Sequence, residues 1–297
     1  MKLTGKTHVY GIIGNPVSHS LSPMFQAYFA EKYRVDAVYV PFSVSDEGLQ
    51  VALDGLREAS IQGLNITVPF KESVLPYVCM DDDVRCIGAA NTLQSQGGKW
   101  HAYNTDWQGI AAVMKGSGLD FQEQSILLFG AGGTARAALH AAAMMGVTRV
   151  WVCNRSVERR DALLHHARKA YPKMLCEAVD WHQAAVDKAS MDACLMMNTT
   201  SIGLSDHQVF PFYLQGSGWA MDAVYRADGE TAFVCAARQA GRDVVDGLPM
   251  LVAQGVQSFE IWHPECELDI LDALHWMTGE LNRVPFNFPG WEGVHET

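Results

Sequence analysis

The sequence has no excess of basic residues and no apolar run long enough to span a membrane. Its 297 residues include 33 Asp and Glu against 22 Lys and Arg, which gives a formal net charge of −11. This balance argues against a general nucleic-acid binder, which usually needs a basic face. Because the N-terminus also lacks the apolar core of a signal peptide, we expect a cytoplasmic protein with no membrane partner.

Paired cysteine and histidine patterns are also missing. None of the seven cysteines forms a Cys-x-x-Cys pair, and the eleven histidines include no His-x-x-x-His. These absences argue against a zinc site and a disulfide framework, so we expect free thiols in a reducing compartment and no bound metal.

What the chain does contain is an alternation of apolar strands and helical segments long enough for about two domains. In the first part, strands are predicted at 9–13, 37–44 and 63–67, and a hairpin over 91–103 leads into a helix at 107–114. The intervening helices are predicted to begin with Ser22 and Asp46 as N-caps, with Pro23 in the first helical position. Strand, helix, strand, helix, strand indicates parallel pairing.

From Ser125 the strand–helix alternation becomes stronger. Strands are predicted at 126–129, 149–153, 194–197 and 220–224, and helices at 134–145, 157–170 and 230–240. Two amphipathic helices follow, at 250–262 and 268–283. We therefore expect an α/β protein with two domains: a substrate domain made of residues 1–106 plus 247–297, and a Rossmann-like, doubly wound dinucleotide-binding domain over 107–246.

A glycine turn joins the strand at 126–129 to the helix after it. The spacing is Gly130-x-Gly132-x-x-Ala135, the dinucleotide form in which alanine replaces the last glycine. Gly130 permits the turn, Gly132 lets a pyrophosphate approach the backbone, and Ala135 lets helix and strand pack closely. The helix dipole and free N–H groups would face a phosphate. The alternative is a tight strand–helix turn with no ligand.

The end of the next strand bears on the choice of dinucleotide. A carboxylate at this position selects NAD, and a basic residue accommodates the 2′-phosphate of NADP. Here the strand ends in Asn154-Arg155-Ser156, and Arg159 lies four positions after Arg155, so both arginines can reach one phosphate. This favours NADP, although Glu158 argues against it and a solvated basic turn is the alternative.

Hydride transfer from a carbinol needs a group that takes the hydroxyl proton. Lys71 and Asp106 are candidates, since each stands at the end of a predicted element in the first domain. A lysine beside a carboxylate in a closed cleft can shuttle a proton while the pair stays nearly neutral. The alternative is two surface charges, with Asp106 serving only as a helix N-cap.

Nine short motifs then occur in one order along nearly the whole chain. They are Ser20-Leu-Ser22-Pro23, Asn65-x-Thr67-x-Pro69-x-Lys71, Gly88-Ala-Ala-Asn91-Thr92, Asn104-Thr105-Asp106, Gly130-Ala131-Gly132-Gly133, Asn154-Arg155-Ser156-x-x-Arg159, Asn198-x-Thr200, Asp222-x-Val224-Tyr225 and Gly247-Leu248-x-Met250-Leu251-Val252-x-Gln254. In this order the chain resembles the shikimate dehydrogenase family.

The resemblance implies NADPH-dependent reduction of 3-dehydroshikimate to shikimate in aromatic amino-acid biosynthesis, with Lys71 and Asp106 as the catalytic pair. It implies that Ser20 and Ser22 bind the substrate carboxylate, near Tyr225. Thr67, Asn91 and Gln254 would bind the ring hydroxyls. The cofactor residues it implies are Gly130, Ala131, Gly132, Gly133, Thr134, Ala135, Asn154, Arg155, Ser156, Arg159, Thr200, Gly247 and Met250.

The sequence departs from the family pattern at Pro249, where relatives often have Gly, and at Ser201. Both could alter how the nicotinamide face is lined, but neither removes a reacting group. Relatives that favour quinate often carry Thr in place of the second serine, so Ser22 favours shikimate. The alternatives are a quinate or dual quinate/shikimate dehydrogenase using NAD, and a non-catalytic NADP-binding sensor. We expect a monomer or homodimer that acts on a small molecule.

Overall fold

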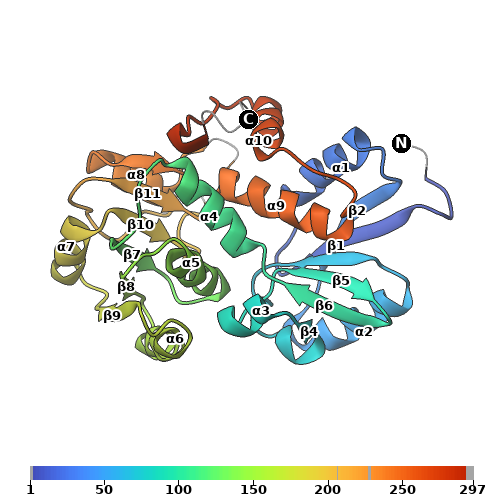
Figure 1. Cartoon of the computed structure of the whole chain (residues 1–297), viewed down its shortest axis with the longest axis horizontal. Helices are drawn as coiled ribbons and strands as arrows, with labels where there is room; N and C mark the ends of the chain where they lie inside the picture. The colour runs from blue at the N-terminus through green and yellow to red at the C-terminus, as the bar shows by residue number, and fades with distance from the viewer. Residues whose placement is uncertain (1–2, 206, 227–228, 292–297) are drawn as a thin grey trace. The chain divides into compact units, whose positions relative to one another are not determined.

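The computed structural model describes residues 3–205, 207–226 and 229–291, and these form two compact units (Figure 1). The first comprises the described residues up to Gln108 together with Leu251–Met277. The second comprises Gly109–Met250 and the described residues from Thr278 onward. The sequence-based division assigned all of 247–297 to the first domain, whereas the structure divides this segment between the two units.

A six-stranded sheet forms the centre of the first unit, in the order β2-β1-β3-β5-β6-β4. Its strands are β1 (His8–Gly14), β2 (Ala37–Ser43), β3 (Gly63–Ile66), β4 (Cys79–Met80), β5 (Thr92–Gln96) and β6 (Lys99–Tyr103). β1 pairs in parallel with both β2 and β3, as predicted, and β5 and β6 form the predicted hairpin. The parallel register, with Ile13 opposite Ile66, brings the segments after β1 and β3 to the same edge of the sheet.

The helical segments of the first unit include two predicted helices, which have different starts, and two short segments at 75–77 and 82–87 that were not predicted. They are α1 (Ser22–Lys32), η1 (Asp46–Gly48), α2 (Leu49–Glu58), η2 (Leu75–Tyr77) and α3 (Asp82–Ile87). The N-cap of α1 is Leu21 rather than Ser22, and the Ser22 N–H donates to Ser20 Oγ at 3.2 Å. The side chain of Ser20 thus accepts from the N–H of the first residue of α1, and the N-cap itself makes no side-chain hydrogen bond. Asp46 opens the short η1 turn, so α2 begins only at Leu49.

Three longer helices belong partly to each unit. They are α4 (Asp106–Gly116), α9 (Leu248–Trp262) and α10 (Ile270–Glu280). α9 and α10 match the two amphipathic helices predicted after Gly247. Among the described residues, the structure has no helix of sufficient length and apolarity to pass through a bilayer.

The second unit contains a second six-stranded sheet, in the order β12-β11-β10-β7-β8-β9, and all its pairs are parallel. Its strands are β7 (Ser125–Phe129), β8 (Arg149–Cys153), β9 (Leu175–Val179), β10 (Leu195–Asn198), β11 (Trp219–Asp222) and β12 (Asp243–Val245). Counted from β7, this is the order 3-2-1-4-5-6 of the doubly wound dinucleotide-binding fold. The predicted fold class is confirmed.

The helices of this sheet are α5 (Gly133–Met144), α6 (Val157–Ala170), α7 (Gln183–Asp192) and α8 (Ala232–Gln239), and η3 (Pro289–Trp291) follows near the end. Phe129, the last residue of β7, packs against other phenylalanines in the core of this unit. Its ring centroid lies 5.1 Å from that of Phe210, edge to face, and 6.0 Å from that of Phe233. Edge-to-face packing of this kind stabilises a core by more than its buried area alone. The strand that leads into the glycine turn is thereby held rigidly.

Candidate active site

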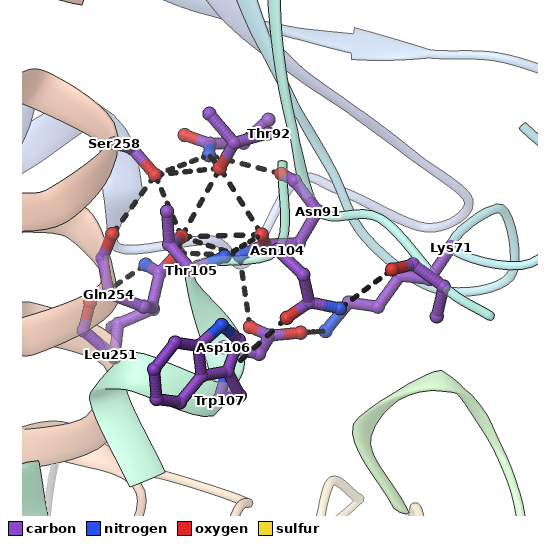
Figure 2. Close-up of polar contacts among 12 residues, drawn as sticks. Lys71, Asn91, Thr92, Asn104, Thr105, Asp106, Trp107, Leu251, Gln254 and Ser258 are labelled. Carbon is purple, nitrogen blue, oxygen red and sulfur yellow. Dashed lines mark hydrogen bonds and ion pairs between the residues drawn. The ribbon is translucent and has the colours of Figure 1, made fainter. Parts of the chain in front are cut away.

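Lys71 and Asp106 lie within hydrogen-bond distance of each other in the first unit. Lys71 follows the turn after β3, and Asp106 is the first residue of α4. Lys71 Nζ donates to Asp106 Oδ2 at 2.7 Å, and the side chains are only 13 % and 6 % exposed (Figure 2). The N-cap role considered for Asp106 belongs to Asn104, whose Oδ1 accepts the Trp107 N–H at 3.3 Å. The two charges are therefore a largely buried pair rather than separate surface groups.

Asn91, just before β5, holds the other carboxylate oxygen. Its Oδ1 accepts the Thr105 N–H at 2.6 Å, which fixes the orientation of the amide. Its Nδ2 then donates to Asp106 Oδ1 and to Gln254 Oε1, each at 3.1 Å. Gln254 Nε2 donates in turn to Leu251 O at 2.7 Å. The structure thus joins Lys71, Asp106, Asn91 and Gln254 in one hydrogen-bonded group (Figure 2).

Behind this group lies a buried polar cluster to which the sequence-based prediction gave no role. Asn65 on β3 accepts the Tyr39 hydroxyl at 2.7 Å, and its Nδ2 donates to Asn91 O at 3.2 Å. Thr92, Thr105 and Ser258 complete the cluster, and all three are fully buried. The available sequence signal was Asn65 itself, a polar residue in an otherwise apolar strand.

Ser20, Ser22 and Thr67 lie on the segments that follow β1 and β3. The Thr67 N–H donates to Ile13 O at 2.9 Å, so Thr67 stands directly beside the end of β1. Ser22 is 2 % exposed, whereas Ser20 is only partly buried. Open α/β sheets bind their ligands at this edge. The contacts of these three residues with a substrate stay a prediction.

In the second unit, the glycine turn has the geometry that a dinucleotide site needs. Gly130 has φ of +115°, and a Cβ at this position would lie 2.4 Å from Thr199 Oγ1, so only glycine fits. Gly132 is the N-cap of α5 and makes no side-chain cap, so no side chain at this position blocks the approach of a ligand to the helix N-terminus. Ala135 is fully buried against the sheet.

The arginines after β8 take different positions. A Cβ added to Gly132 would lie 3.7 Å from an Arg159 guanidinium nitrogen, which places this cation against the glycine turn. Arg155 is exposed and lies in the turn between β8 and α6. Arg160 faces elsewhere: it is 7 % exposed and donates to Asp180 Oδ1 at 2.8 Å. Of these three arginines, Arg159 and Arg155 fit a phosphate site, and Arg160 has a structural role.

Glu158, which argued against NADP, accepts the Ser156 hydroxyl at 2.9 Å. A hydrogen bond from its own backbone N–H and the one from Ser156 lower the pKa of Glu158. The Ser156 hydroxyl also accepts the Arg159 N–H at 3.2 Å and so caps α6. The side chains of Glu158 and Ser156 therefore make hydrogen bonds at the start of α6. Asn154 Nδ2 also donates there, to Ser156 O at 2.8 Å.

The other predicted cofactor residues share the carboxyl edge of the second sheet. Thr200 follows β10, with its Oγ1 donating to Asn198 Oδ1 at 2.7 Å. Gly247 follows β12, and a Cβ there would lie 2.4 Å from Ala223 O. Ala131 and Thr134 flank the glycine turn, and Met250 is buried near the start of α9. Tyr225 follows β11 and belongs to this unit, so its predicted position near the substrate carboxylate stays a prediction.

A buried acid, Asp222, closes the end of β11. Its carboxylate accepts Thr231 Oγ1 at 2.6 Å, Asn198 Nδ2 at 2.8 Å and the Val224 N–H at 2.9 Å. Burial raises its pKa to about 7, against the lowering effect of these three hydrogen bonds. The carboxylate thus links the end of β10, just before the predicted cofactor residue Thr200, to the loop after β11, which carries the predicted substrate residue Tyr225.

Comparison with known proteins gives one consistent family. Residues 12–93 match the family model described as the shikimate dehydrogenase substrate binding domain. The chain is 36% identical over 270 residues to shikimate dehydrogenase (NADP(+)) of Aquifex aeolicus, an alignment that covers 90% of this chain and 94% of that one. The crystal structure of the Aquifex aeolicus enzyme superposes with a TM-score of 0.82 at 34% identity, covering 93% of this chain and 99% of that chain. Shikimate 5-dehydrogenase of Thermus thermophilus in complex with NADP(H) and shikimate gives a TM-score of 0.79 at 30% identity, with 92% and 99% covered.

Proposed function

Because the chain belongs to the shikimate dehydrogenase family, we propose that it catalyses the reversible, NADP-dependent reduction of 3-dehydroshikimate to shikimate. This step belongs to aromatic amino-acid biosynthesis. The observation that carries the proposal is the Lys71–Asp106 pair: a proton-transfer pair with a 2.7 Å hydrogen bond, largely buried, and tied to Asn91 and Gln254. A non-catalytic sensor would have no use for this arrangement.

In the proposed mechanism, Lys71 and Asp106 handle the proton of the reacting hydroxyl. During oxidation of shikimate the pair takes that proton, and during reduction it returns it. Asp106 accepts from Lys71 on Oδ2 and from Asn91 on Oδ1, so both carboxylate oxygens are held in place before substrate binds. Pre-organisation of this kind places the acceptor without a further ordering cost at the moment of reaction.

The substrate would bind in the first unit. Ser20 and Ser22 are hydroxyl donors for its carboxylate, and Thr67, Asn91 and Gln254 face its ring hydroxyls. Relatives that favour quinate often carry Thr at the position of Ser22, so the serine here favours shikimate. The first unit, made of the described residues up to Gln108 together with Leu251–Met277, would thus be a substrate domain.

The glycine turn and the arginines fit NADP. Gly132 makes no side-chain cap at the start of α5, Gly130 and Gly132 keep the approach to the helix N-terminus open, and Arg159 brings a positive charge against the turn. Arg155 is exposed beside it, where it can meet a 2′-phosphate. Bound NADP supplies the hydride acceptor or donor.

A rate assay with both cofactors and both acids tests the proposal. The purified protein is expected to reduce NADP⁺ with shikimate much faster than NAD⁺, and to oxidise shikimate faster than quinate. Substitution of Arg155 and Arg159 by Ala is expected to remove most of the preference for NADP⁺. Equal or faster turnover with NAD⁺ would refute the role of the two arginines, and faster turnover of quinate would favour the quinate enzyme. Cofactor binding without turnover of either acid would favour the sensor.

A further inference from the structure

Ser258 lies at the centre of the buried cluster behind the proposed substrate site. It stands one helical turn after Gln254 on α9, on the same face of the helix, and its side chain is fully buried. Figure 2 shows its hydroxyl surrounded by polar groups. The partners of Ser258 Oγ are Gln254 O at 2.9 Å, Asn65 Nδ2 at 3.0 Å, Thr92 Oγ1 at 2.8 Å and Thr105 Oγ1 at 3.0 Å.

Two of these partners fix the direction of the hydrogen bonds. Gln254 O is a carbonyl and can only accept, so the Ser258 hydroxyl donates to it. Asn65 Nδ2 also faces the carbonyl oxygen of Asn91, at 3.2 Å, which identifies this atom of Asn65 as the nitrogen. Asn65 therefore donates to Ser258. Because the Ser258 hydroxyl donates its one proton to Gln254 O, its oxygen can only accept further hydrogen bonds.

The Ser258 hydroxyl is thus an acceptor available to the Thr105 hydroxyl. Thr105 Oγ1 lies 2.9 Å from Asn91 Nδ2, and it accepts from this nitrogen while its own proton points to Ser258. Without Ser258 Oγ, the nearest other acceptors for the proton of Thr105 are Asn91 Oδ1 and Thr92 Oγ1, each at 3.2 Å, and Gln254 Oε1 at 3.4 Å. Two of these three are amide oxygens of proposed substrate-binding residues.

The effect reaches the catalytic pair through Asn91. Asn91 Nδ2 has two protons and three acceptors, on Thr105, Asp106 and Gln254. If the Thr105 hydroxyl rotates, the hydrogen bond from Asn91 Nδ2 to Thr105 changes, and with it the hydrogen bond that Asn91 donates to Asp106 Oδ1. Thr105 is also the residue directly before Asp106. The distances form a continuous path from Ser258 through Thr105 and Asn91 to the carboxylate.

We propose that Ser258 is a positioning residue for the reaction: its hydroxyl holds Thr105 and Asn91 in the orientation in which Asn91 donates to Asp106. The assignment rests on the proposed function of the Lys71–Asp106 site. Ser258 acts through its neighbours and is too deeply buried to meet the substrate.

The test compares Ser258→Ala with the unaltered protein in NADP⁺ reduction by shikimate. We expect kcat to fall about tenfold, which corresponds to one neutral hydrogen bond that is effective in the transition state. The KM for NADP⁺ should not change, because the proposed cofactor residues belong to the second unit. Ser258→Cys fills the same space with a poor hydrogen-bonding group and should lose as much. It serves as the second variant if the alanine protein does not fold.

Ser190→Ala is the matched control. Ser190 is also fully buried in a helix, and its hydroxyl donates only within that helix, to Asp187 O at 3.0 Å. We expect this variant to keep kcat. The Ser258→Ala/Thr105→Val double variant should be no slower than the slower single variant, because both substitutions interrupt one path.

Three outcomes would overturn the assignment: a Ser258→Ala kcat within twofold of the unaltered protein, an equal loss in Ser190→Ala, or fully additive losses with Thr105→Val. Absence of turnover in the unaltered protein would instead refute the proposed function, and the assignment with it. The unaltered protein is therefore measured first.

Discussion

One methyl group added at Gly132 and one added at Gly130 should have different consequences, although both glycines belong to the same turn. Gly132 has φ of −108°, which other residues adopt readily, and its nearest neighbour would be Arg159 at 3.7 Å, an ordinary contact distance. Gly130 has φ of +115°, and its Cβ would lie 2.4 Å from Thr199 Oγ1 and 3.0 Å from Thr199 C. We predict that Gly132→Ala weakens NADP binding and that Gly130→Ala destabilises the fold.

The size of each effect follows from these contacts. For Gly130→Ala, the left-handed backbone costs about 1–2 kcal/mol and the overpacking about 1–3 kcal/mol, so the sum is about 2–5 kcal/mol. Thr199 cannot easily move aside, because its hydroxyl and its N–H both donate to Phe129 O at 2.7 Å. For Gly132→Ala, the same overpacking cost of about 1–3 kcal/mol destabilises only the complex with NADPH, because the added methyl group would contact the bound cofactor. It corresponds to a loss of affinity of about five- to 150-fold, at tenfold for each ~1.4 kcal/mol.

The assay pairs urea unfolding of both variants with titration of NADPH fluorescence. Gly132→Ala should unfold at nearly the same urea concentration as the unaltered protein and bind NADPH more weakly. Gly130→Ala should unfold at a clearly lower urea concentration. Unchanged NADPH affinity in Gly132→Ala, or a loss of stability as large as that of Gly130→Ala, would refute the different roles assigned to the two glycines.

Two further predictions concern buried charges. His263 is 6 % exposed, its Nε2 is buried with no hydrogen-bond partner among the described residues, and burial lowers its pKa. The folded protein therefore binds the proton of His263 less readily than the unfolded chain does, and the free energy of unfolding should fall as pH drops below about 6.5. Urea unfolding at pH 7.5 and 5.5 should show a smaller loss for His263→Phe, and an equal loss would contradict this reasoning. Arg283 makes a bidentate ion pair with the buried Asp246, at 3.0 and 3.1 Å, so Arg283→Met should cost about 3–5 kcal/mol. Arg238→Met, at an exposed pair with Glu230, should cost at most ~1 kcal/mol in the same unfolding measurement, and similar losses in the two variants would contradict the structural role of Arg283.

The sequence predicted best those elements whose signal is local. β8 and α6 have the predicted bounds, because a short apolar run and a helix opening with a Ser156 cap can be recognised from adjacent residues. The glycine spacing predicted the turn after β7 for the same reason. The parallel pairing of β7 with β8 and of β10 with β11 was likewise expected from the order of strands and helices, since parallel strands joined by helices have few possible orders.

Elements with weak local signals were missed. β9 lies at the edge of the second sheet, and its first residue, Leu175, is 48 % exposed, so its apolar alternation is incomplete. α7 begins after His182, whose ring nitrogen accepts the Ala185 N–H. Histidine is not among the preferred N-cap residues, so it does not indicate the start of a helix. In the C-terminal segment, Arg283 pairs with Asp246, 37 positions away, and a contact at this separation cannot be predicted from adjacent residues.

The candidate site shows the same limit. The resemblance placed Lys71, Asp106, Asn91 and Gln254 in the site, and the structure joins them by hydrogen bonds. Ser258 stands on the buried face of an amphipathic helix, where the sequence gives only a core position. Its partner Asn65 is 193 residues away, so the link between them becomes visible only in the folded chain.

The rate of NADP⁺ reduction by shikimate in Lys71→Ala tests the central claim most directly. We predict a fall of about 10²- to 10⁴-fold relative to the unaltered protein, the usual contribution of a proton-transfer group, with NADPH affinity unchanged. Lys32→Ala is the matched control, because Lys32 in the same unit also pairs with a carboxylate, that of Asp272, and has a more exposed side chain. That variant should keep its full rate. A Lys71→Ala protein that retains the rate of the unaltered one would contradict the role given to the Lys71–Asp106 pair.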